Sequence, residues 1–120
     1  MTIQKVHAKS GCTVYCLLTD CNDVPILPED VSSISYSIYQ IVDFGNYLPV
    51  ETHQDVNVPK SSILESLQTQ IHTGETYNFS FTISAVEHPP FPERNAEYAV
   101  EIAIHDLDNE PHIVPLQCKT

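Results

Sequence analysis

Apolar and polar residues alternate with a period of two along three stretches of the chain. These stretches cover residues 33–38, 77–83 and 98–104. Because successive side chains of a β-strand point to opposite faces, each stretch predicts a strand with one buried and one solvated face. Further strands are expected near residues 3–8, 12–19, 47–57 and 111–118, so that about seven strands are predicted in all.

The segments between the expected strands carry turn residues and one helical pattern. Residues 20–23 and 106–109 are rich in Asp and Asn, which bond to their own backbone or tolerate positive φ. A short helix is predicted from Pro59 to Gln68. There Ser62 and Glu65 have capping-box spacing, and Ile63, Leu64 and Leu67 form an apolar stripe near residues 60–68. We therefore expect a single all-β domain, residues 1–120, folded as a mainly antiparallel β-sandwich.

The charge balance narrows the classes of partner. The chain has 16 Asp and Glu residues against five Lys and Arg, a net charge of −11. Such a charge repels phosphate backbones and anionic lipid, so neither nucleic acid nor a membrane is an expected partner. It suits solubility, a basic protein surface or bound cations.

The first residues, MTIQKVHAKSG, lack the apolar core of a signal peptide, which predicts synthesis in a cytoplasm where thiols stay reduced. The sequon Asn78-Phe79-Ser80 is then interpreted as three residues of a strand.

Three of the four cysteines lie in the stretch GCTVYCLLTDC, and the fourth is Cys118. On a strand, Cys12 and Cys16 share one face and lie about 13 Å apart at ~3.3 Å per residue. That separation is too large for a disulfide or for one shared zinc ion. Cys12 and Cys16 are therefore interpreted as packing residues. Cys21 falls in the following turn, and a disulfide through Cys118 remains an alternative.

The acidic segment from His105 to His112 is a candidate cation site. Asp106, Asp108 and Glu110 could offer oxygen ligands to calcium, but the glycine and distal Glu of an EF-hand loop are missing. A polar hairpin tip between the last two strands explains the same residues.

Motifs for catalysis and cofactor binding are missing. The chain has no HExxH pair, no GxSxG elbow and no glycine-rich phosphate loop. We expect no enzyme activity and no cofactor, although paired carboxylates for acid–base chemistry stay open because they are spatial and not sequential.

Two segments each allow two interpretations. Phe91 lies among prolines in Glu87-His88-Pro89-Pro90-Phe91-Pro92, where it could anchor a partner at low entropic cost or plug the end of the sandwich. The N-terminal residues 1–10 could be an arm that pairs with a neighbouring subunit or an ordinary first strand.

Three stretches together resemble a known group of proteins. They are TVYCLLTDCNDVPILPEDVSSISYSIYQI, PVETHQDVNVPKSSILESLQTQ and AEYAVEIAIHDLDNEPHIVPLQC, within residues 13–118. In this order they resemble small structural proteins of tailed bacteriophages, with Cys21 where a small polar residue is expected. The resemblance implies an immunoglobulin-like sandwich that serves as a capsid cement or decoration protein, or as a head–tail neck component.

The function expected on this basis is that of a virion structural protein, formed in the host cytoplasm, that reinforces contacts between capsomers. Its partners would be the major capsid protein or other virion proteins and further copies of itself, joined by many weak contacts. The expected contact residues are Ile3, Val6, Phe91, Val114 and Leu116. A receptor- or carbohydrate-binding module with a tyrosine-lined groove is the alternative, and a metalloenzyme is a third hypothesis.

Overall fold

The fold is that of a computed structural model, which describes residues 3–20, 22–43, 45–71, 73–86 and 88–120, with only the backbone described for residues 3–5. The described residues form nine strands and two short 3₁₀ helices. The strands are β1 (Ile3–Lys5), β2 (Cys12–Cys16), β3 (Val31–Asp43), β4 (Asn46–Pro49), β5 (Val56–Val58), β6 (Ile63–Thr69), β7 (Thr76–Ile83), β8 (Glu97–Asp106) and β9 (Pro111–Lys119). The 3₁₀ helices are η1 (Pro28–Asp30) and η2 (Lys60–Ser62).

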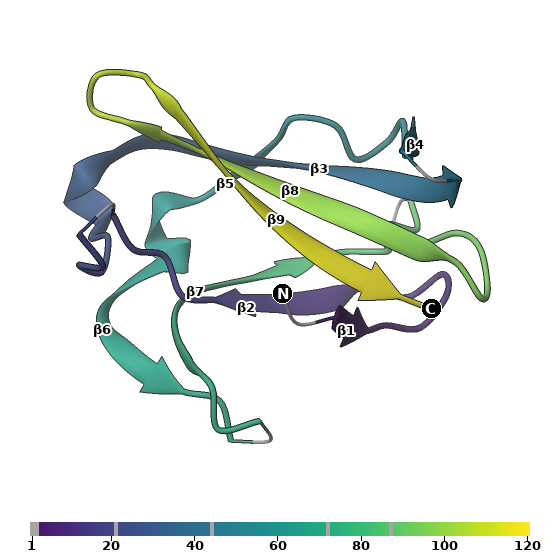
Figure 1. Ribbon diagram of the computed structural model, residues 1–120, viewed down its shortest axis with the longest axis horizontal. Coiled ribbons are helices and arrows are strands. Elements are labelled where there is room, and N and C mark those ends of the chain that lie inside the picture. Colours follow the sequence, from purple (N-terminus) through teal and green to yellow (C-terminus); the bar gives the residue numbers. More distant parts are fainter. Residues whose placement is uncertain (1–2, 21, 44, 72, 87) are drawn as a thin grey trace.

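The strands form two sheets that pack face to face. The larger sheet has the order β1-β9-β8-β3-β4, with β5 also paired to β3, and the smaller sheet has the order β2-β7-β6. In Figure 1, β3, β8 and β9 lie in one layer above β2 and β7. All pairs are antiparallel except β1 with β9. The predicted all-β, mainly antiparallel sandwich is confirmed.

The strand order agrees with that of immunoglobulin-type sandwiches. There the G, F and C strands form one sheet and the B, E and D strands form part of the other. β9, β8 and β3 correspond to G, F and C, and β2, β7 and β6 to B, E and D. Tyr98, near the start of β8, accepts a 2.8 Å hydrogen bond at its hydroxyl from the Glu93 backbone N–H, which is the tyrosine corner of this fold.

The core lies between the sheets and follows the predicted alternation. The inward residues are Ile34, Tyr36 and Ile38 on β3, Tyr98, Val100, Ile102 and Ile104 on β8, and Val14, Phe79 and Ile83 on the smaller sheet, all buried. Dense β-branched and aromatic residues at alternate positions favour strands that can bury one face.

The helix predicted from Pro59 to Gln68 is wrong. The segment forms the single turn η2 and then strand β6, in which Ile63 pairs with Phe79 and Thr69 with Thr76. A helix of about ten residues is marginal in isolation, and the free edge of β7 offers backbone partners instead. No α-helix occurs in the described part of the chain, and hence none that is long and apolar enough to cross a membrane.

The expected strand at residues 47–57 is two strands. β4 and β5 flank a turn in which Asp55 has a positive φ of 49°. Both strands pair with the same long partner, β3, at different points along it. The turn therefore lets one chain segment cover two parts of one edge.

The N-terminal residues form an ordinary first strand. β1 pairs in parallel with β9, with Ile3 opposite Gln117, and the Val6 N–H then donates to the Lys119 carbonyl at 2.9 Å. The structure therefore supports the interpretation of this segment as an ordinary first strand, which pairs within its own chain.

Candidate functional site

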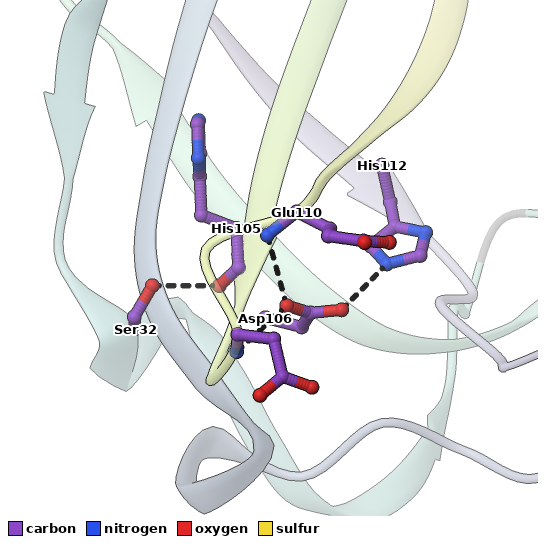
Figure 2. Close-up of polar contacts among 6 residues, drawn as sticks. Ser32, His105, Asp106, Glu110 and His112 are labelled. Atoms are coloured by element: carbon purple, nitrogen blue, oxygen red, sulfur yellow. Dashed lines mark hydrogen bonds and ion pairs between the residues drawn. The ribbon is translucent and has the colours of Figure 1, made fainter.

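The hairpin between β8 and β9 forms a polar tip that projects beyond one end of the sandwich (Figure 1). One carboxylate oxygen of Asp106 accepts backbone N–H bonds from Asp108, at 2.9 Å, and Glu110, at 3.0 Å. The other oxygen lies 3.1 Å from Nε2 of His112, as Figure 2 shows. The bond from Glu110 and the contact with His112 together hold the pKa of Asp106 below its usual value.

This tip has the chemistry of a turn. A second turn repeats it, because one oxygen of Asp20 accepts N–H bonds from Asn22 and Val24 at 2.8 and 3.0 Å. In each turn the third residue after the Asp has a positive φ, 61° at Asp23 and 62° at Asn109. Asp and Asn favour both features, so the two turns need no ligand to explain their sequences.

The hairpin tip does not assemble the candidate calcium site of Asp106, Asp108 and Glu110. The Asp106 oxygens bind backbone N–H groups and His112, while Asp108 and Glu110 are exposed. Across the described residues, no three His, Cys, Asp or Glu side chains are grouped closely enough to hold a metal ion. The hairpin interpretation is therefore the one that the geometry supports.

The described cysteines are packing residues. Cys12, Cys16 and Cys118 are free thiols that pack in or against the hydrophobic core. Burial raises the pKa of Cys12 to about 11 and the pKa values of Cys16 and Cys118 to about 12. Since the thiolate is the nucleophile, these groups are unreactive at neutral pH. Cys21, the other residue of interest for oxidation, lies outside the described residues.

This burial predicts a pH-dependent thiol reactivity. In a Cys21→Ser protein, Cys12, Cys16 and Cys118 are expected to resist a disulfide reagent at pH 8, with a thiolate fraction about 100-fold or more below that of a free thiol. Their folded pKa values lie above the ordinary value of 9.0. Their contribution to stability is thus complete below pH 9 and is lost as the pH rises toward 12.

A spectroscopic thiol titration measures this reactivity, and the same protein in urea is the control. Three equivalents of reagent should react rapidly in urea and only at the rate of unfolding without it. Rapid reaction of the native protein at pH 8 would contradict the packing assignment.

The residues expected to contact a partner are placed mostly inside the protein. Phe91 and Val6 are buried, and Val114 and Leu116 are half-buried against the core. The Phe91 ring packs edge-on against Tyr98 at a centroid distance of 5.2 Å. Phe91 therefore plugs the sandwich, and its selection as a partner contact is wrong. The side chain of Ile3 lies outside the described part of the chain.

Buried His53 is a polar connection that the sequence analysis did not identify. Its Nε2 lies 2.9 Å from the His88 carbonyl, which can only accept, so Nε2 donates. Its Nδ1 lies 2.8 Å from the Tyr36 hydroxyl. Both ring nitrogens thus tie the turn after β4 to β3 and to the proline-rich loop.

The larger sheet has an outer face, on the side away from the smaller sheet. We define this outer face by the positions that point away from the core on its three central strands. They are Ser33, Ser35, Ser37, Tyr39 and Ile41 on β3, Glu97, Ala99, Glu101, Ala103 and His105 on β8, and Pro111, Ile113, Pro115, Gln117 and Lys119 on β9.

The middle of the outer face carries short side chains. Ala99, Ala103, Ser35 and Ser37 occupy its middle, where Ala99 and Ser37 are buried and Tyr39 lies opposite Ala99. Apolar groups flank them, with Tyr39 on one side and Ile113, which is 53% exposed, on the other. The sequence signal was the presence of Ala99 and Ala103 at positions expected to be solvated.

Comparisons with known proteins add no relative. No family model, no curated protein and no solved structure matches the chain.

Proposed function

We propose that this protein is a non-enzymatic structural component of a tailed-phage particle, a decoration protein that docks on the capsid shell through the outer face. The observation that carries the proposal is the set of small and apolar side chains at outward positions of this face, among them Ala103, Tyr39 and Ile113. An antiparallel sheet that faces water normally alternates apolar with polar residues. Here the outward positions of the central strands also hold alanine, proline, isoleucine and tyrosine, beside serines, Gln117, His105 and the charged Glu97, Glu101 and Lys119.

The chemistry of this face suits a broad protein surface. The short side chains of Ser35 and Ala103, which are half-buried, let a partner approach the sheet closely, and Tyr39 and Ile113 provide apolar contact on either side of that area. The acidic remainder of the chain keeps free copies apart before assembly and attracts a basic docking surface. The resemblance to phage structural proteins identifies that surface, in this proposal, as the capsid shell, where many weak contacts act together.

The proposal is tested by co-sedimentation with capsid shells assembled from the major capsid protein of the phage that encodes the chain. Ala103→Glu places a charge in the middle of the outer face and is expected to weaken binding by about tenfold or more. Thr69→Glu, at an exposed position on β6 of the other sheet, is the matched control and should bind as the unmodified protein does. Equal binding of both variants, or no binding of the unmodified protein, would reject the proposal.

A further inference from the structure

A hollow lies at the end of the larger sheet opposite the hairpin tip. It has a volume of about 1010 Å³ and is formed by the end of β3, the start of β4, the loop before β8 and one residue of β9. Its polar groups come from Gln40, Asp43, Tyr47, Glu93, Arg94, Asn95, Glu97 and Gln117. These residues are far apart in the sequence and meet because β3, β4, β8 and β9 pair side by side.

The hollow combines an aromatic ring with planar hydrogen-bonding groups. Tyr47 is 51% exposed, and its ring centroid lies 6.4 Å from that of Tyr39. The amides of Asn95 and Gln117 both donate and accept, whereas the carboxylates of Asp43 and Glu97 accept. Gln117 and Glu97 are already oriented toward each other, with the amide Nε2 3.3 Å from a carboxylate oxygen.

The mixture of groups selects among ligand classes. A phosphate or nucleic acid would meet the carboxylates of Asp43, Glu93 and Glu97 against the single guanidinium of Arg94. A purely apolar ligand would leave several amides and carboxylates desolvated without partners. A polyhydroxylated ring satisfies both conditions, because its hydroxyls pair with amides and carboxylates while its C–H face covers an aromatic side chain.

We propose that this hollow binds a neutral oligosaccharide, with Tyr47 as the aromatic contact and Asp43, Asn95 and Gln117 as hydroxyl-binding groups. Sites for small molecules are concave and place a few polar groups beside an apolar wall, which Ile41 provides here. The hollow lies within one chain and shares Ile41, Glu97 and Gln117 with the outer face, so a glycan bound here would compete with the capsid shell for these residues.

The test is a glycan array that includes neutral and anionic oligosaccharides, followed by calorimetric titration with the neutral glycans that bind. Tyr47→Ala should lower the affinity by about tenfold, the effect of one lost aromatic contact. Tyr15→Ala is the matched control, because Tyr15 is 40% exposed on the other sheet. Gln117→Ala tests the polar contacts. Gln117 is a polar residue outside the hydrophobic core, so its replacement should not disturb folding.

Each outcome decides the proposal. Binding of neutral glycans that falls with Tyr47→Ala and Gln117→Ala, but not with Tyr15→Ala, supports it. Absence of binding, binding of anionic glycans alone, or equal binding by all three variants overturns it. Ala103→Glu lies outside the residues that line the hollow and should leave glycan binding unchanged, so this result is separable from attachment to the capsid.

Discussion

Replacing Phe91 by alanine is expected to lower the free energy of unfolding by about 4 kcal/mol, the usual cost of removing a fully buried phenylalanine ring. Phe91 has no exposed surface and packs edge-on against Tyr98, whose hydroxyl accepts the Glu93 N–H. The backbone around it is also fixed, since the Phe91 carbonyl accepts the Lys9 N–H at 2.8 Å. The variant therefore leaves a cavity that the surrounding structure fills only in part.

Urea unfolding followed by circular dichroism measures this loss. Phe91→Leu should cost less than Phe91→Ala, because it keeps most of the apolar volume. Val86→Ala is the surface control, since Val86 is 91% exposed. A change below about 0.5 kcal/mol for Phe91→Ala, the range of ordinary surface substitutions, would show that Phe91 is not part of the core.

Replacing Asn78 by alanine is expected to cost about 2–3 kcal/mol, because it leaves a buried backbone group without a partner. The Asn78 carbonyl oxygen accepts the Leu18 N–H at 2.7 Å, and its amide donates to the Leu18 carbonyl at 2.9 Å. In the variant, the Leu18 carbonyl still accepts a hydrogen bond from the Ile26 N–H. The Leu18 N–H, by contrast, loses the Asn78 side-chain oxygen that accepts its hydrogen bond. Asn78 thus joins β7 to the segment after β2.

The same measurement with Asn57→Ala provides a matched control, because Asn57 is an exposed asparagine on β5. Asn57→Ala should leave the midpoint of unfolding unchanged. Equal stability of the two variants would contradict the assigned role of Asn78. The buried position also confirms that Asn78-Phe79-Ser80 is part of a strand, since the amide that a glycan would modify is 1% exposed.

The strands that could be predicted are those whose burial repeats every second residue. β3, β7 and β8 alternate over six or more residues, and most of their inward positions are buried, although Asn78, Ser37 and Ala99 at positions predicted to be solvated are buried as well. The turns at Asp20 and Asp106 were equally readable, because their side chains bond only to neighbouring backbone. Local chemistry determines both kinds of feature.

β6 could not be predicted because its conformation depends on a distant strand. Ile63, Leu64 and Leu67 fit a helical stripe, yet Leu67 is 51% exposed and Ile63 lies in the core beside Phe79. Pairing with β7 makes this segment a strand, and the sequence of residues 63–69 alone does not reveal that pairing.

The candidate sites could be predicted less well than the strands. An apolar side chain in a loop, such as Phe91, can point inward or outward, and the sequence alone does not distinguish these cases. The outer face left a partial signal in Ala99 and Ala103, two small residues at positions expected to be solvated. The hollow left none, because Asp43, Asn95 and Gln117 meet only through strand pairing.

The central claim is that the outer face docks on a capsid shell, and a cryo-electron microscopy reconstruction of shells saturated with the protein tests it most directly. The account predicts that shell density contacts β3, β8 and β9 over Ala99, Ala103 and Ile113. Shell density against β2, β7 and β6, or shells that carry no added density at saturating protein, would contradict it.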